Sequence, residues 1–216
     1  MILGIYGAGG LGREILDIAL RINQVKNKWE EICFIDDIST VKQLNGMNVI
    51  NFEELKNLKN AEVIIAIGEP LYREQIYIKL INNNIKLSTL IDPTAIISKH
   101  ALIEEGVIIG AYSSINTNAQ IKTNCLIQPY CLIGHDVKIG KHSVISTHFT
   151  PGGGCEIGDR VFVGMQSTVK EKIEIGNDCI IGMGSVVFKN TTTNMIVMGN
   201  PARAILKNEE HKVFKK

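Results

Sequence analysis

A histidine followed by an aspartate, His135 and Asp136, has the residue types needed to move a proton. An imidazole accepts a proton near neutral pH, and a neighbouring carboxylate can hold its tautomer or raise its basicity. Consecutive side chains point to opposite faces of an extended strand, so adjacency in sequence leaves their contact open. The pair is a candidate general base with an orienting carboxylate.

A glycine-rich turn near the amino terminus is a second candidate site. A G-x-G-x-x-G pattern begins at Gly7, directly after the apolar segment 2–6, and an amphipathic helical pattern follows over 15–22. Bare backbone N–H groups at a helix N-terminus suit a phosphate. Asp36 and Asp37 end the next apolar segment, where a carboxylate can meet a ribose or base. This context favours nucleotide binding; the alternative is a turn that only packs the helix closely.

Three consecutive glycines at 152–154 form a third candidate site. A glycine triplet leaves room beside the backbone and can position an N–H group for a carbonyl oxygen of a ligand. The alternative is an ordinary loop that bulges from the fold. His142 and His148 lie six residues apart without a complete set of metal ligands, so we expect no metal site.

A six-residue repeat must position the histidine and the glycine triplet. From 91 to 187, sixteen of seventeen positions taken six apart are Ile or Val, and only Pro151 departs. This period is typical of a hexapeptide β-helix, in which three hexads close one coil and coils stack about 4.8 Å apart. Glycine often follows the Ile or Val and suits a tight turn or a close neighbour. Small residues often stand two positions before it, including four cysteines (Cys125, Cys131, Cys155 and Cys179), whose role we interpret as packing.

An α/β domain must position the glycine turn. Apolar segments at 2–6, 32–35, 61–67 and 85–91 predict strands, and helices are expected from about 15–22, 51–58 and 72–80. This is half of a dinucleotide fold, so a mononucleotide or a sugar carried on one fits better than NAD. We expect domains at 1–90 and 91–216, with the boundary near Asp92 and Pro93.

Composition narrows the partners. The formal net charge of +1 gives no general attraction to nucleic acid or acidic membranes. No stretch approaches twenty apolar residues, so no membrane insertion is expected. No basic leader precedes the first strand, and packing explains most of the cysteines, so we expect a reduced, cytoplasmic protein.

Taken together, these motifs resemble those of one bacterial family of sugar acetyltransferases. It includes sialic-acid O-acetyltransferases and the UDP-4-amino-sugar N-acetyltransferase of bacillosamine synthesis. The segments that carry the resemblance are Gly7-Ala8-Gly9-Gly10-Leu11-Gly12, Phe34-Ile35-Asp36-Asp37, Ile65-Ala66-Ile67-Gly68, Ile133-Gly134-His135-Asp136 and Gly199-Asn200-Pro201-Ala202-Arg203. The resemblance implies a Rossmann-like α/β half domain followed by a left-handed parallel β-helix, assembled as a homotrimer.

The resemblance also implies roles for individual residues. His135 would be the general base, made more basic by Asp136. The nucleotide-sugar would lie on Gly9, Gly10, Leu11, Asp36, Asp37 and Gly68, and acetyl-CoA on Gly153, Met165, Met183 and Arg203. Two positions depart from the family, because Leu11 and Val144 stand where histidines are common. His142 and His148 are the nearby histidines that could replace the second of these.

We therefore expect an acetyl-CoA-dependent N-acetyltransferase that acts on a nucleotide-linked amino sugar. Three alternatives remain open from the sequence: an O-acetyltransferase acting on a sugar hydroxyl, an NAD-linked oxidoreductase, and a trimer that binds nucleotide-sugar without catalysis.

Overall fold

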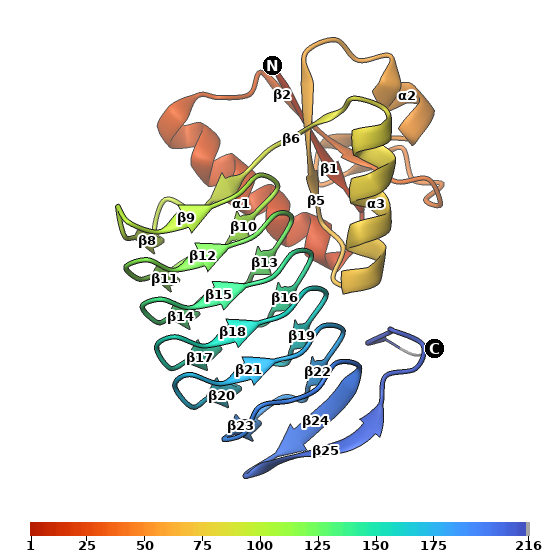
Figure 1. The fold of residues 1–216 in the computed structure, drawn as a ribbon. Helices are drawn as coiled ribbons and strands as arrows, with labels where there is room; N and C mark the ends of the chain where they lie inside the picture. Colours follow the sequence, from red (N-terminus) through yellow and green to blue (C-terminus); the bar gives the residue numbers. More distant parts are fainter. Residues whose placement is uncertain (215–216) are drawn as a thin grey trace.

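A computed structural model describes residues 1–214 and shows an α/β sheet followed by a column of short parallel strands (Figure 1). The sheet order is β3-β4-β2-β1-β5-β6, and all neighbours are parallel except β3 and β4. Its elements are β1 (Ile2–Tyr6), α1 (Gly10–Lys26), β2 (Glu31–Ile35), β3 (Gln43–Leu44), β4 (Met47–Ile50), α2 (Phe52–Lys56), β5 (Ala61–Ile65), α3 (Pro70–Asn82) and β6 (Lys86–Leu87). The expected fold class is confirmed.

One local expectation fails in this sheet, and one element was not expected. The segment 85–91 is not one strand: β6 ends at Leu87, and the chain then bends into the first strand of the column. The bend lets Leu87 pair with β5 while Leu90 pairs with the next coil. The β3–β4 hairpin was not expected, although its turn, Asn45-Gly46, has the positive φ values (47° and 78°) that this dipeptide favours.

The column has three faces, and strands in adjacent coils pair with a shift of eighteen residues. The first face contains β7 (Leu90–Ile91), β10 (Ile108–Ile109), β13 (Leu126–Ile127), β16 (Val144–Ile145), β19 (Phe162–Val163) and β22 (Ile180–Ile181). The second contains β8 (Ile96–Ile97), β11 (Ser114–Ile115), β14 (Leu132–Ile133), β17 (Thr150–Pro151), β20 (Thr168–Val169) and β23 (Val186–Val187). The third contains β9 (Leu102–Ile103), β12 (Gln120–Ile121), β15 (Lys138–Ile139), β18 (Glu156–Ile157) and β21 (Glu174–Ile175).

Each corner of the column turns through a left-handed residue. The first corner, after the first face, carries Tyr112 (φ 57°); the second carries Asn118 (58°) and the third Asn124 (57°). The glycines that follow the Ile or Val have a different function, since a Cβ on Gly110 would lie 2.6 Å from the backbone nitrogen of Pro129 in the next coil. Close stacking of coils, rather than the turn itself, requires those glycines.

The interior of the column is filled by the Ile and Val of the repeat. The small residues two positions earlier add hydrogen bonds: Ser143 Oγ donates to the carbonyl of Gly158 (2.9 Å), and Cys125 Sγ to that of Gly140 (2.9 Å). All five cysteines are buried and free, so packing accounts for them. Burial raises the pKa of the Cys125 thiol to about 12, which keeps it protonated and unreactive.

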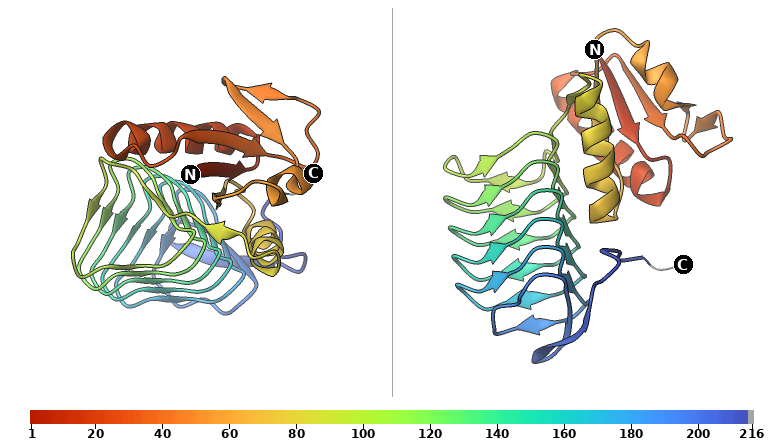
Figure 2. Two further views of the ribbon diagram at one scale, coloured as in Figure 1. Left: turned by 90° about the horizontal axis from the view of Figure 1, so that it is seen from above. Right: turned by 45° about the vertical axis from the view of Figure 1, so that its right-hand side comes forward.

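The α/β part covers one side of the column (Figure 2). Helix α1 packs on the first face, where Ile15 and Ile18 share a buried cluster with Leu126 and Val144. Helix α3 docks on the third corner through Arg73, which is fully buried. Two faces of the column, the second and third, stay clear of this packing.

Among residues 1–214, Arg73 has no carboxylate partner at this contact between α3 and the column. Its guanidinium donates to the carbonyls of Ile65 (2.7 Å) and Ile67 (3.0 Å) at the end of β5, and to the carbonyl and Oδ1 of Asn124 in the column. Burial lowers the pKa of Arg73 to about 10, so it remains charged at pH 7. Arg73 therefore ties the column to the end of the α/β sheet.

A hairpin closes the far end of the column. Strand β24 (Met195–Gly199) pairs with β22, and β25 (Ala202–Lys207) pairs antiparallel with β24. The chain then returns along the column as a carboxy-terminal tail, residues 208–214, toward the amino-terminal end of α3. None of the helices within residues 1–214 has the length and apolar character needed to cross a bilayer.

Replacing Arg73 with Met should lower the free energy of unfolding by about 3–5 kcal/mol, because several buried acceptors lose their donor together. Urea unfolding followed by circular dichroism measures this change. Lys59→Met, at an exposed position, is the matched control. An unchanged midpoint for Arg73→Met would show that this joint does not stabilise the fold.

Candidate active site

His135 and Asp136 meet at the second corner of the column. His135 Nδ1 lies 2.7 Å from Asp136 Oδ2. The contact forms because Asp136 adopts the left-handed conformation (φ 58°), which turns the chain and brings two consecutive side chains together. With a proton on Nδ1 shared with the carboxylate, Nε2 carries the free lone pair and is the atom able to act as a base.

Asn118, one coil earlier, completes this arrangement. Its Nδ2 donates to Asp136 Oδ1 (3.0 Å), so both carboxylate oxygens are engaged. The hydrogen bonds from His135 and then Asn118 lower the pKa of Asp136, which remains ionised at neutral pH. The site is open to solvent, so a substrate can reach the imidazole.

Gly153, one coil after His135, lies directly beside the imidazole. A Cβ at this position would overlap His135 Cε1 and Nε2, so only glycine leaves the ring where it is. The amide of Gly152 donates to the carbonyl of Val169 (2.8 Å), and the amide of Gly154 donates to the carbonyl of His135 (2.9 Å). Within residues 1–214 the amide of Gly153 has no acceptor, which leaves one N–H group next to the base.

The glycine triplet is not a bulging loop. Strand β17 keeps its place in the coil and pairs with β20. Between β14 and β17, however, the ladder is interrupted, and the second face divides into two short sheets. This interruption lies at Pro151 and the glycines after it, beside His135, so an irregular step of the column adjoins the candidate base.

The glycine turn after β1 opens into a cavity of about 850 Å³. Of the residues predicted to bind a nucleotide-sugar, this cavity contains Gly9, Gly10, Leu11, Asp36 and Gly68. The predicted set is thus brought together except for Asp37.

Asp36 braces the turn as well as lining the cavity. It accepts hydrogen bonds from the amides of Ala8 (3.0 Å), Ile38 (2.9 Å) and Ser39 (2.8 Å). Burial alone would raise the pKa of Asp36, but these three donors outweigh it and lower the pKa. The carboxylate is therefore a fixed negative charge at the rim of the turn.

Asp37 lines an adjoining cavity of about 310 Å³, bounded also by Tyr72. Its carboxylate is held by Tyr6 Oη (2.6 Å), Lys79 Nζ (2.8 Å) and the amide of Phe52 (2.8 Å). These contacts tie β2 to β1, α3 and α2. Nucleotide binding by Asp37 stays a prediction, and its contacts within the chain already give it a structural function.

The residues predicted for acetyl-CoA do not form one site within a single chain. Gly153 lies at the second corner, whereas Met165 and Met183 lie at the first corner, across the second face, with 47% and 73% of their surface exposed. Arg203 is on β25 at the end of the column, in a cavity of about 320 Å³ that also contains Lys189. The predicted cofactor residues thus occupy both edges of the second face and its far end.

His142 and His148, the two histidines near Val144, differ in their surroundings. His142 is buried at the third corner, where its Nδ1 lies 3.0 Å from Asn124 Nδ2 and its ring packs on Tyr77. His142 therefore cannot contact a cofactor unless it leaves the interface between α3 and the column. His148 is exposed at the first corner and stacks on Tyr130, with ring centroids 5.2 Å apart.

Burial, followed by the charges of Arg73, Arg160 and Lys141, lowers the pKa of His142 to about 4, although Asp159 opposes the shift. The unfolded chain takes up this proton near pH 6.5, so stability is lost as the pH falls below 6.5. At pH 5 the loss from this group should be about 2 kcal/mol.

His142→Gln removes this titrating group. Urea unfolding at pH 7 and pH 5 should show a pH-dependent loss smaller by about 2 kcal/mol in the variant than in the unmodified chain. His148→Gln, at the exposed first corner, is the control. Equal losses in all three chains would contradict a neutral buried His142.

The cavity and the imidazole lie on opposite sides of the chain. The α/β part covers the first face and the third corner, whereas His135 is at the second corner. In a triangular column the second corner is opposite the first face (Figure 2). The two candidate sites therefore cannot act on one molecule within a single chain.

Comparison with known proteins agrees with both halves of the chain. Residues 3–80 match the model described as the PglD N-terminal domain, and residues 154–189 match that of the bacterial transferase hexapeptide (six repeats). A GDP-perosamine N-acetyltransferase of Escherichia coli O157:H7 is 29% identical over 156 residues, which are 70% of this chain and 68% of that protein. The chain belongs to the PglD-type family of hexapeptide-repeat sugar N-acetyltransferases.

Two solved structures of similar proteins cover nearly all of this PglD-type chain. WeeI from Acinetobacter baumannii AYE superposes with a TM-score of 0.88 at 27% identity, covering 95% of this chain and 100% of its own. The acetyltransferase domain of PglB from Neisseria gonorrhoeae FA1090, in complex with acetyl coenzyme A, gives 0.70 at 26% identity, covering 94% and 98%.

Three features of this PglD-type site were not foreseen from the sequence. Asn118 could have been found, because it stands eighteen residues before Asp136 and three hexads make one coil. Tyr72 and the tail residue Phe214 also line the cavity at the glycine turn. They lie far from the glycine turn in sequence and belong to no repeat, so no pattern indicated them.

Gly153→Ala should lower kcat/KM about 10- to 100-fold, because the added methyl group displaces the imidazole by a distance that matters for proton transfer. Steady-state kinetics measures this, and the thermal unfolding midpoint should change little. Glu171→Ala, at the equivalent position one coil further on, is the control. Full activity in Gly153→Ala would show that Gly153 is not needed to position His135.

Proposed function

We propose that this chain transfers the acetyl group of acetyl-CoA to the amino group of a nucleotide-linked amino sugar. The observation that carries the proposal is the hydrogen-bonded pair of His135 and Asp136 with the amide of Gly153 beside it. The relatives support the two substrates: one is named a GDP-perosamine N-acetyltransferase, and another is solved with acetyl coenzyme A.

His135 Nε2 acts as the general base. It takes the proton from the neutral amine as the amine nitrogen forms a bond to the thioester carbonyl carbon. Asp136 stabilises the imidazolium that results, because its carboxylate already accepts the Nδ1 proton. The amide of Gly153 is placed to donate to the oxyanion. When the C–S bond breaks, the imidazolium returns its proton to the thiolate, which leaves as free CoA.

The glycine turn holds the other substrate. Gly9 and Gly10 begin helix α1 and present backbone N–H groups to the cavity, as a diphosphate requires. Asp36 and Gly68 form the opposite rim. The adjoining cavity at Asp37 and Tyr72 gives room for the nucleobase. The chain provides a complete nucleotide seat, remote from its own imidazole.

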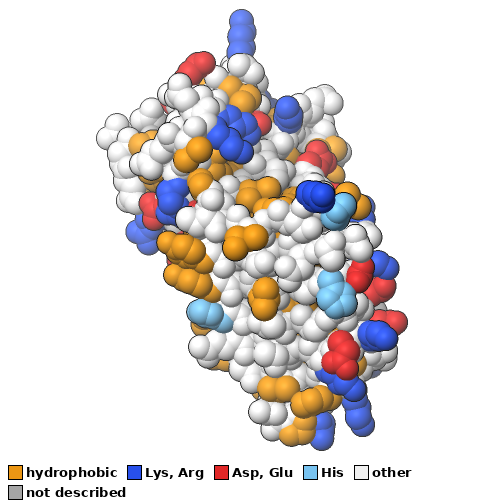
Figure 3. Space-filling view, turned by 90° about the vertical axis from the view of Figure 1, so that its left-hand side faces the viewer, with side chains coloured by type: hydrophobic (Ala, Val, Ile, Leu, Met, Phe, Trp, Pro, Cys, Tyr) orange, Lys and Arg blue, Asp and Glu red, His pale blue; other side chains and the backbone are white. Residues whose placement is uncertain are grey.

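A second copy of the chain completes the site, and we propose a homotrimer. The second face and first corner, which the α/β part leaves clear, carry apolar side chains: Ile96, Leu132 and the stacked rings of Tyr112 and Tyr130 are exposed. Figure 3 shows hydrophobic side chains gathered along this side of the column. Such a patch is typical of an interface.

Closed threefold packing gives each chain the same contacts. It would bring Gly153 of one chain opposite Met165 and Met183 of a neighbour, so that acetyl-CoA lies in the groove between them. It would also bring His135 of one chain to the nucleotide cavity of another. Arg203 and Lys189 at the end of the column then meet the phosphates of the cofactor.

His135→Ala should lower kcat about 10²- to 10⁴-fold, with the KM for both substrates nearly unchanged, because only the proton acceptor is removed. Release of the CoA thiol, followed with a thiol reagent, measures the rate. Asp136→Asn should cost less, about tenfold or more, since the imidazole remains. Kinetics within a few-fold of the unmodified enzyme for His135→Ala would refute the assignment.

A further inference from the structure

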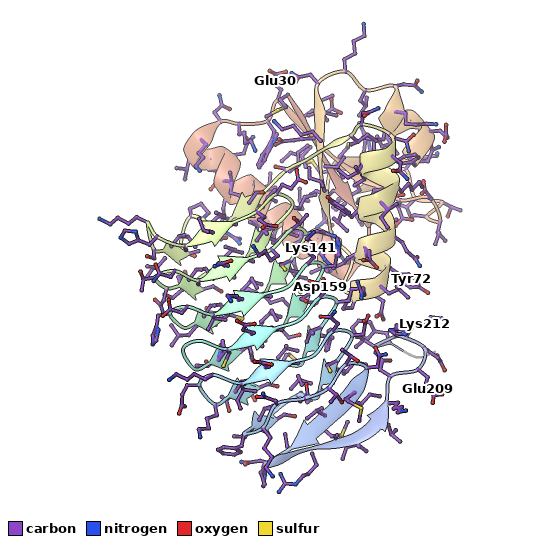
Figure 4. The ribbon with its side chains drawn as sticks, viewed as in Figure 1. Glu30, Tyr72, Lys141, Asp159, Glu209 and Lys212 are labelled. Carbon is purple, nitrogen blue, oxygen red and sulfur yellow. The ribbon has the colours of Figure 1, made fainter. Side chains whose placement is uncertain are left out.

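The carboxy-terminal tail forms one wall of the nucleotide cavity. Lys212 and Phe214 line it together with the glycine turn and Tyr72. In Figure 4, Lys212 lies just below the amino-terminal end of α3, which carries Tyr72. Residues at opposite ends of the sequence thus enclose the same space.

A buried carboxylate holds the tail in place. Glu69, at the start of α3, is 5% exposed and accepts from the backbone amides of Val213 (3.0 and 3.1 Å) and Phe214 (3.1 Å). It makes no capping bond to its own helix. A buried carboxylate that takes its donors from the tail is costly to leave unpaired, so the tail is held at this position.

Two further contacts anchor the tail on the column. Phe214 packs edge-on against Phe162 of the first face, with ring centroids 5.6 Å apart. At the other end, Asn208 is buried, and its Nδ2 donates to the carbonyl of Asp178 (3.0 Å). The Lys212 amide in turn donates to Asn208 Oδ1 (3.2 Å). Lys212 therefore stands on a segment fixed at both ends.

The charge of the cavity gives Lys212 a specific importance. Asp36, Glu69 and Glu210 contribute carboxylates to its lining, and Lys212 contributes the only basic side chain among the described residues that line it. A nucleoside diphosphate carries at least two negative charges, which the carboxylates of Asp36 and Glu69 repel. The glycine-turn amides supply partial positive charge, and one ammonium group supplies a full charge.

We propose that Lys212 binds the diphosphate of the nucleotide-linked sugar and that the tail it stands on is part of the substrate site. This inference rests on the proposed function, because it takes the cavity at the glycine turn as the nucleotide seat. The substrate class that it specifies is a nucleoside diphosphate sugar, whose charge meets both Lys212 and the glycine turn in the lining of one cavity.

Calorimetric titration of the full chain with UDP, GDP and dTDP tests the proposal. Lys212→Ala should weaken binding of the preferred nucleoside diphosphate about tenfold, as expected for the loss of a charged contact, and Lys212→Arg should restore most of it. The corresponding monophosphate should lose less affinity. In steady-state assays, Lys212→Ala should raise the KM for the nucleotide-sugar and leave kcat and the KM for acetyl-CoA unchanged.

Lys207→Ala is the matched control, since it removes one lysine just before the tail and outside the cavity. Equal affinities of Lys212→Ala and the unmodified chain would overturn the inference but leave the proposed function intact. A failure of Lys212→Arg to restore binding would also overturn it, because packing rather than charge would then explain the loss. If the unmodified chain bound no nucleoside diphosphate, the proposed function would itself fail.

Discussion

The parallel ladder of the column is the constraint on which the rest of the structure depends. Because each coil takes eighteen residues, a side chain at any corner is stacked on those eighteen positions before and after it. That stacking puts Asn118 on Asp136 and Gly153 beside His135. The candidate base His135 is therefore positioned by backbone pairing that runs the length of the column, and not by a local loop.

The same ladder builds the joint between the two halves of the chain. Asn124, His142, Arg160 and Asp178 follow one another at the third corner, and α3 docks on this row through Arg73 and Glu74. A corner used for docking is unavailable for catalysis. This docking thus determines which faces remain open and leaves His135 on the side away from the cavity at the glycine turn of its own chain. The proposal that a second chain completes the site rests on this packing of one chain.

Periodic features were predictable from the sequence because packing repeats them. The column, its interior Ile and Val and four of the five buried cysteines follow from the six-residue period. The glycine turn and the acidic end of β2 were likewise predictable, since strand, turn and helix are consecutive. The contact between His135 and Asp136 was not, because adjacent side chains on an extended strand point apart, and only the structure shows the left-handed φ of Asp136 that brings them together.

Contacts between residues that belong to no repeat could not be predicted from the sequence. Glu69 and Phe214 are far apart in sequence, and a lone glutamate before a helix gives no sign that it holds the tail. The burial of His142 was equally hidden, because its corner position is the same as that of exposed residues; only the docking of α3 buries it. Such contacts depend on how segments far apart in the sequence pack together, which no local sequence pattern shows.

The central claim is that one chain supplies the imidazole and another the nucleotide. It is tested most directly by mixing two inactive variants: His135→Ala, and Gly9→Phe, whose side chain fills the cavity from a position with open space around it. Each alone should be inactive. Coexpressed as mixed oligomers, they should recover about a quarter of the activity, because half of the imidazoles and half of the cavities remain intact and combine at random. Mixed oligomers without activity would show that each chain acts alone.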